Sequence, residues 1–119
     1  MEIIKERVYD TDQHSGYRIL VDRVWPRGVK KADLAMDLWA KDITPSPDLR
    51  KWFNHESDKF EKFREKYRKE LTENKEFKTF IKEICDKNEP IIFLFAAKDP
   101  IHNHVNVLID CIEEDLKGH

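Results

Sequence analysis

The sequence predicts an α/β domain of three layers, with a short, mainly parallel sheet and helices packed on it. Two apolar runs, 19–21 and 91–97, are continuous and rich in branched side chains, as in strands covered on both faces. A helix-rich block separates them and provides the long crossover that parallel strands require. At 119 residues the chain is expected to form a single domain over 1–119, with a core of its own.

Three strands are expected, each bounded by residues that disfavour a continued ladder. Residues 1–9 alternate loosely between apolar and polar side chains and predict the first strand. The second covers 17–25, because Pro26 cannot donate to a ladder and Gly28 favours a turn. The third covers 91–97, and the residues from Lys98 to Pro100 end it.

Residues 29–47 fit either a short helix running into an extended piece, which we prefer, or a short strand. Four helices are then expected, of which the first begins with Ser46 as N-cap and Pro47 at its first position. Ser57 and Asp99 are the expected N-caps of the second and the last helix, and the third covers 74–86. Three- and four-residue spacing marks their buried faces, which include Phe60, Phe63, Tyr67, Leu71, Phe77, Phe80, Ile84, Ile101, Val105 and Leu108.

Composition excludes several classes of protein. A net charge of −2 argues against general adhesion to DNA or acidic membranes, although residues 17–30 hold four cationic side chains against one carboxylate. Charged residues interrupt the first ten positions, so no signal peptide is expected, and the run 91–97 is too short to cross a bilayer. Cys85 and Cys111 are expected to be buried thiols. These features predict a protein of the reducing cytoplasm without membrane contact.

The second strand ends among arginines. Arg23 and Arg27 lie at or just beyond its carboxyl end, where open α/β sheets bind ligands. Each guanidinium presents a planar fork of donors that suits phosphate or carboxylate. Alternatively, one of them forms a structural ion pair with Asp22 or Asp37. Trp25 is expected either in the core, which its large area favours, or as an apolar wall for a ligand.

The segment from Lys98 to His104 combines a cation, a carboxylate, an amide and two imidazoles at the expected start of the last helix. Free N–H groups and the helix dipole favour an anion there, and a histidine there acts as a neutral donor or base. The plainer alternative makes Asp99 a cap and His102 and His104 surface residues. These histidines lie about 200° apart on a helix, so no metal is expected. No P-loop, dinucleotide fingerprint or nucleophile elbow occurs, and no cofactor is expected.

The stretch 16–28, Gly-Tyr-Arg-Ile-Leu-Val-Asp-Arg-Val-Trp-Pro-Arg-Gly, resembles the hallmark of the YeaO-like family, a bacterial and archaeal domain of unknown function (number 488). The similarity continues at 37–41, 45–46, 49–53, 55, 96–99 and 102–104. The resemblance implies a compact cytoplasmic α/β domain and no established activity. It also groups one polar set: Asp22, Arg23, Arg27, Lys41, Arg50, His55, Lys98, Asp99, Asn103 and His104.

Because the carboxyl ends of parallel strands meet at one edge, Arg23, Trp25 and Arg27 are expected close to residues 98–104. The leading hypothesis is a pocket for an anionic small molecule, phosphate- or nucleotide-like. The expected ligand-binding residues are Arg23, Trp25, Arg27, Lys41, Arg50, Lys98, His102 and Asn103. For an enzyme, we expect a hydrolase or transferase, with His104 or His55 as proton carrier and Asp22 or Asp99 as orienting carboxylate. The alternatives are a nucleic-acid-binding accessory module using the same surface and a structural ion-pair network that acts through a partner protein.

Overall fold

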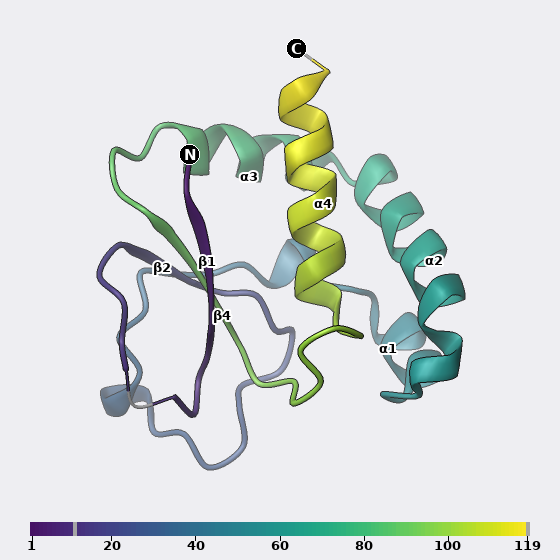
Figure 1. The fold of residues 1–119 in the computed structure, drawn as a ribbon, viewed down its shortest axis with the longest axis horizontal. Helices are drawn as coiled ribbons and strands as arrows, with labels where there is room; N and C mark the ends of the chain where they lie inside the picture. Colours follow the sequence, from purple (N-terminus) through teal and green to yellow (C-terminus); the bar gives the residue numbers. More distant parts are fainter. Residues whose placement is uncertain (11, 119) are drawn as a thin grey trace.

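The computed structural model describes residues 1–10 and 12–118. A parallel four-stranded sheet runs through the molecule in the order β1-β4-β2-β3 (Figure 1). Its strands are β1 (Ile3–Arg7), β2 (Tyr17–Leu20), β3 (Leu38–Trp39) and β4 (Ile91–Phe95). β4 is buried along its whole length, as its continuous apolar run predicts. The predicted α/β class with a parallel sheet is therefore confirmed.

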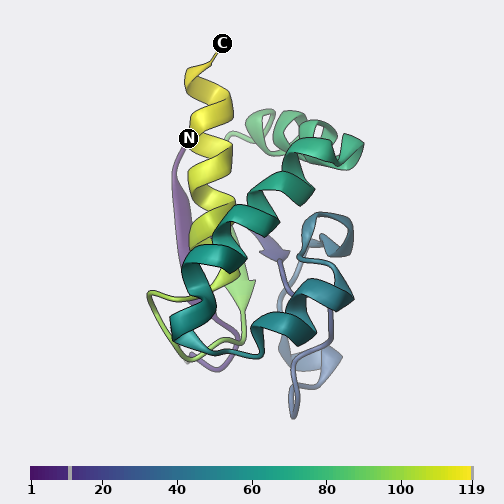
Figure 2. The same cartoon turned by 90° about the vertical axis from the view of Figure 1, so that its right-hand side faces the viewer.

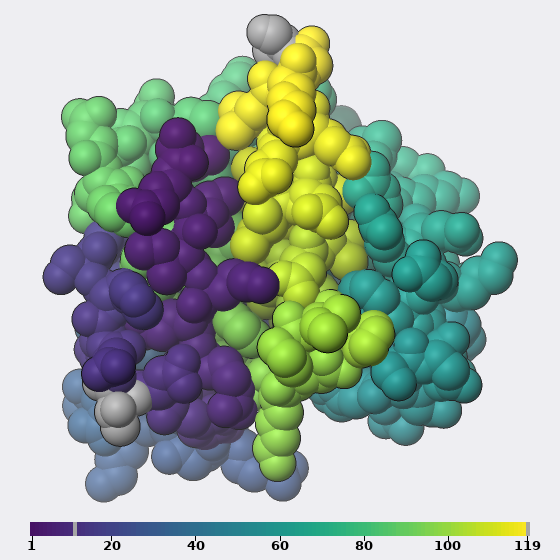
Figure 3. Space-filling model, in the orientation of Figure 1, coloured from purple at the N-terminus to yellow at the C-terminus, as the bar shows by residue number. Residues whose placement is uncertain are grey.

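The helices cover one face of this sheet. They are α1 (Pro47–Phe53), α2 (Phe60–Glu73), α3 (Lys75–Cys85) and α4 (His104–Lys117). Alternate strand residues, such as Ile19, Phe93 and Phe95, share one buried core with the apolar faces of all four helices. Seen from the helical side, α2 crosses over α4 (Figure 2). In the space-filling view, α4 lies between β1 and α2 (Figure 3).

Irregular chain covers the other face. Leu20, Ile92 and Leu94 form a second, smaller core with Leu34, which follows the 3-10 turn η1 (Lys31–Asp33). Partly buried side chains, Trp25 among them, pack against this second core. The sheet thus lies between a layer of helices and a layer without α-helix.

Arg18 and Glu6 form a buried ion pair away from the helices. Arg18 Nη2 donates to Glu6 Oε2 at 2.6 Å, and only 8% and 2% of the two side chains are exposed. Burial alone would raise the pKa of Glu6, but hydrogen bonds from Arg18 and His14 outweigh it and lower that pKa below its usual value. Because β4 separates β1 from β2, this pair joins two strands that are not neighbours in the sheet.

Several predicted element boundaries were wrong. The second strand ends at Leu20 instead of Trp25. Residues 29–47 form two 3-10 turns, η1 and η2 (Lys41–Ile43), with the two-residue strand β3 between them. Ser57 opens a 3-10 turn, η3 (Ser57–Lys59), and makes no capping hydrogen bond to α2. Ser46 does cap α1, since its Oγ accepts from the Leu49 N–H at 3.2 Å.

The last helix begins four residues later than predicted. Its N-cap is Asn103, whose Oδ1 accepts from the Asn106 N–H at 3.0 Å. Asp99 instead closes a turn ahead of the helix, which leaves Ile101 exposed. Cys85 is likewise exposed, whereas Cys111 is buried, and burial raises the pKa of the Cys111 thiol. Over the described residues, no helix is both long and apolar enough to span a bilayer.

Candidate functional site

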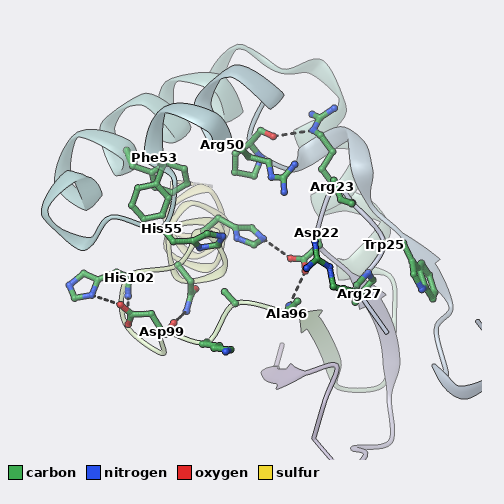
Figure 4. Close-up of a pocket in the computed structure, with 18 of the residues that line it drawn as sticks. Asp22, Arg23, Trp25, Arg27, Arg50, Phe53, His55, Ala96, Asp99 and His102 are labelled. Atoms are coloured by element: carbon green, nitrogen blue, oxygen red, sulfur yellow. Dashed lines mark hydrogen bonds and ion pairs between the residues drawn. The ribbon is translucent and has the colours of Figure 1, made fainter. Parts of the chain in front are cut away.

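A cavity of about 810 Å³ opens at the carboxyl ends of β2 and β4 (Figure 4). The residues that follow these two strands form much of its lining, and residues in or beside α1, α2 and the start of α4 contribute most of the rest. Its volume lies in the range of small-molecule sites, and its position is the one that open α/β sheets use for ligands.

The structure brings nearly all of the predicted site residues together around this cavity. They are Asp22, Arg23, Trp25, Arg27, Arg50, His55, Lys98, Asp99, His102, Asn103 and His104. Lys41 is the exception, and its assignment to the pocket needs correction. It belongs to η2, where its Nζ lies 3.8 Å from the centroid of the Trp39 ring, because the ammonium is attracted to the aromatic face.

Some lining residues escaped the sequence analysis. Tyr9 follows β1 and donates from its hydroxyl to the Arg27 carbonyl at 2.9 Å. The rule that ligands bind at strand ends could have indicated it. Phe53 and Phe63 stack with ring centroids 4.3 Å apart and also line the cavity. Helical periodicity marks these two as core residues and does not reveal that one end of the core reaches a cavity.

Four cationic side chains line the cavity: Arg23, Arg27, Arg50 and Lys98. Arg23 donates to two backbone carbonyls, from Nε to Pro45 at 3.0 Å and from Nη2 to Thr44 at 3.4 Å. Arg27, Arg50 and Lys98 are exposed. Within residues 1–10 and 12–118, none of these four cations forms an ion pair. The alternative in which Arg23 or Arg27 pairs with Asp22 or Asp37 is therefore wrong.

Trp25 borders the cavity, but its indole belongs mainly to the core on the other face of the sheet. Its Nε1 donates to the Val29 carbonyl at 2.6 Å, and its ring packs edge-on against Trp39 at 5.4 Å. In Figure 4 it lies apart from the other labelled side chains. The structure thus favours the core interpretation over the apolar wall.

Asp22 connects the end of β2 to the end of β4 and to the first residue of α4. Asp22 Oδ2 accepts from the Ala96 N–H at 2.9 Å, and Oδ1 lies 3.2 Å from His104 Nε2. The same Nε2 lies 2.7 Å from the Val21 carbonyl. Only 15% of the Asp22 side chain and 17% of the His104 side chain are exposed. Asp22 Oδ1 is fully buried and has no hydrogen bond.

The carboxylate of Asp99, the second in the cavity, accepts hydrogen bonds from its own turn. It accepts from the backbone N–H groups of Ile101 and His102 at 2.9 and 3.0 Å, and from His102 Nδ1 at 2.8 Å (Figure 4). These hydrogen bonds, led by the one from the His102 backbone, lower the pKa of Asp99 from 3.8 to about 2. The His102 ring packs edge-on against Phe60. Asp99 and His102 thus shape one wall of the cavity.

His55 enters the cavity from a strained turn. Asn54 ends α1 with φ 47°, and His55 follows with φ 56°, so two consecutive residues other than glycine adopt the left-handed region. Such conformations are costly and cluster at binding sites. Within the described ranges, no three His, Cys, Asp or Glu side chains gather closely enough to hold a metal ion.

Comparison with known proteins places this chain in a family. A family model described as "Inactive DUF488-N3 subclade" matches residues 2–119. The sequence is 48% identical to the uncharacterized protein YeaO of Escherichia coli K12 over 111 residues, covering 92% of this chain and 96% of that protein. It is 46% identical to the uncharacterized protein Rv3073c of Mycobacterium tuberculosis H37Rv over 66 residues, covering 55% and 56% of the two chains. No solved structure shows significant similarity.

Proposed function

Since the chain belongs to the YeaO-like DUF488 family, in the subclade described as inactive, we propose that it binds a phosphate-bearing small molecule in this cavity without converting it. The observation that carries the proposal is the gathering of Arg23, Arg27, Arg50 and Lys98 around one cavity, with no ion pair to any described residue. Such a concentration of positive charge in a chain of net charge −2 favours an anionic ligand.

The kind of cation favours phosphate among anions. A guanidinium matches a phosphate with two parallel N–H···O hydrogen bonds, and three of the four cations are arginines. The side chains of Arg27, Arg50 and Lys98 make no hydrogen bond to described protein groups, so their donors are free for a ligand. Arg23 is held by the carbonyls of Thr44 and Pro45 and contributes mainly its charge.

Binding of single-stranded nucleic acid is the weaker candidate. That function relies on exposed aromatic rings on which successive bases stack. Trp25 is the tryptophan of this surface, yet its indole packs against Trp39 and donates to the Val29 carbonyl. Phe53 and Phe63, which also line the cavity, are almost completely buried.

The test is a thermal-shift screen with inorganic phosphate, sugar phosphates, nucleoside monophosphates and a short oligonucleotide. A ligand at a hundred times its Kd stabilises the folded chain by about 2.7 kcal/mol. Arg27→Ala should weaken the binding of any positive compound about tenfold, as expected when a charge-assisted hydrogen bond is lost. The matched control is Arg64→Ala, which removes an arginine of α2 that lies outside the cavity, 4.0 Å from Asp110 of α4.

Three results would contradict the proposal. The first is the absence of stabilisation by every phosphate compound, and the second is an equal loss of binding in Arg27→Ala and Arg64→Ala. The third is turnover of a bound compound, which would make the protein an enzyme. Stabilisation by the oligonucleotide alone would support the nucleic-acid alternative, and a steep fall of that affinity with salt would accompany it.

A further inference from the structure

We propose that the cavity selects a terminal phosphomonoester over a phosphodiester, and that His104 makes this distinction through its Nδ1 atom. The inference rests on the proposed function, because it names the class of phosphate that the same cavity binds. It starts from the position of the proton on the His104 ring, which two neighbouring acceptors determine.

The His104 ring carries its proton on Nε2. That nitrogen lies 2.7 Å from the Val21 carbonyl oxygen and 3.2 Å from Asp22 Oδ1, and both atoms are acceptors only. A lone pair on Nε2 would face two other lone pairs, so Nε2 is the donor in both charge states of the ring. In the neutral ring, Nδ1 is therefore an acceptor.

Nδ1 is the second polar atom of the His104 ring. In the described part of the chain, no group hydrogen-bonds to it. The only buried polar side-chain atoms there without a partner are Asp22 Oδ1 and Arg68 Nη1. Nδ1 is therefore accessible to solvent, and His104 lines the cavity. A ligand can reach this acceptor, whereas the buried Asp22 Oδ1 lies behind the ring and out of reach.

A phosphomonoester supplies the proton that this acceptor needs. Its second pKa is about 6, so near neutral pH it either donates P–O–H to Nδ1 or passes that proton to the ring. After transfer, the ring is an imidazolium that donates from Nδ1 to the phosphate dianion, and the Asp22 carboxylate faces the new positive charge from the other side. A phosphodiester has no second proton, so a hydrogen between its free oxygens and Nδ1 has to come from the solvent.

The other charged groups of the cavity favour a phosphate that carries two negative charges. Asp22 faces the ring from the end of β2, and Arg23 and Arg27 follow it along the chain. Arg50 and His55 reach the cavity from α1 and its end, and Lys98, Asp99 and His102 from the loop before α4. The four cations outnumber the two carboxylates of the lining, so the empty cavity carries a net positive charge. A dianion offsets them, whereas the single charge of a diester does so less.

The test uses methyl phosphate and dimethyl phosphate, which are small enough to fit whatever the rest of the ligand is. Binding is followed by NMR titration of the ¹⁵N-labelled protein near pH 7. His104→Gln keeps an amide donor for the Val21 carbonyl and removes the acceptor at Nδ1, while all four cations remain. The matched control is His14→Gln, because His14 lies outside the cavity and contacts Glu6.

The wild-type protein and His14→Gln should prefer the monoester, and this preference should fall about tenfold in His104→Gln, the usual effect of one charge-assisted hydrogen bond. Equal binding of the two esters by the wild type, or an unchanged preference in His104→Gln, would overturn the inference and leave the proposed function intact. Binding of neither ester would overturn both.

A measurement on the wild type keeps the inference testable if His104→Gln does not fold. At a pH where the His104 ring is neutral, its ¹⁵N shifts in the free protein should show the proton on Nε2 and none on Nδ1. Methyl phosphate should shift Nδ1 towards the protonated form, and dimethyl phosphate should not. A ring protonated on Nδ1 alone, or one that responds equally to both esters, would contradict the inference.

Discussion

The backbone N–H of Ala96 donates to Oδ2 of Asp22 at 2.9 Å and so joins the ends of two neighbouring parallel strands. One step earlier the same strands still share a ladder, since the Val21 N–H donates to the Leu94 carbonyl at 3.0 Å. At Asp22 a side chain takes the place of the backbone acceptor. The hydrogen bond that ends the sheet therefore also positions the carboxylate that faces His104 in the cavity.

Asp22→Asn should destabilise the fold although it changes little in size. The carboxylate meets two donors, the Ala96 N–H on Oδ2 and the His104 Nε2–H beside Oδ1. Either orientation of an amide places its NH₂ group against one of them. The free energy of unfolding should fall by about 1–3 kcal/mol, measured by urea denaturation. An unchanged stability would show that the proton on His104 does not lie on Nε2.

Breaking the buried ion pair between Glu6 and Arg18 should lower the free energy of unfolding more than Asp22→Asn does. Glu6→Gln leaves the guanidinium of Arg18 without its counter-charge in a site where 8% of that side chain is exposed, and this should destabilise by about 3–5 kcal/mol in urea denaturation. The control is Glu65→Gln, which breaks an exposed pair with Lys62 at 3.8 Å and should change stability by less than about 0.5 kcal/mol. Similar effects of the two variants would show that the Glu6–Arg18 pair is no stronger than a surface contact.

The sequence predicted those parts of the fold that depend on long regular patterns. The apolar run of β4 and the spacing of Phe63, Tyr67 and Leu71 on α2 each repeat over several residues, so single exceptions do not obscure them. β3 has only two residues and shows no period. β3 forms by pairing with β2, and only the tertiary structure reveals this pairing.

The start of α4 shows where local signals conflict. Asp99 followed by Pro100 is as good a start signal as Asn103, because both side chains can accept from a backbone N–H. Asn103 serves as the cap because its side chain is buried and also donates to the Asp99 carbonyl at 2.8 Å. At the cavity, the strand-end rule correctly predicted that Arg27 and Lys98 lie around one site. Lys41 was assigned by resemblance, which indicates shared residues and not their positions.

Alanine at two glycines with positive φ should show how much a steric clash adds to backbone strain. A Cβ at Gly16 would lie 2.3 Å from the Pro90 carbonyl oxygen, which accepts from the Tyr17 N–H at 2.8 Å, so β2 would have to shift. Gly28 has φ +78° and no atom within 4 Å of such a Cβ. Gly28→Ala should lower the free energy of unfolding by about 1–2 kcal/mol, the cost of a left-handed backbone with a side chain. Gly16→Ala should lower it clearly more. Thermal unfolding of both variants measures the difference, and the reverse order would contradict it.

Asp99 should make the fold sensitive to acid in a defined window. Its pKa is lowered from 3.8 to about 2 in the folded chain, so the folded state binds its proton less readily than the unfolded state. The stability that Asp99 contributes is complete above its unfolded pKa and is lost as the pH falls from 3.8 towards about 2. Asp99→Asn keeps an acceptor for the N–H groups of Ile101 and His102, whereas Asp99→Ala removes it.

Urea denaturation at several pH values across this window tests that expectation. Relative to the wild type, both variants should lose stability less steeply as the pH falls, because neither has a group at position 99 that titrates there. Above the window, Asp99→Ala should be less stable than Asp99→Asn, since it leaves the turn before α4 without its acceptor. Parallel pH profiles for all three proteins would show that the hydrogen bonds to Asp99 do not persist in solution.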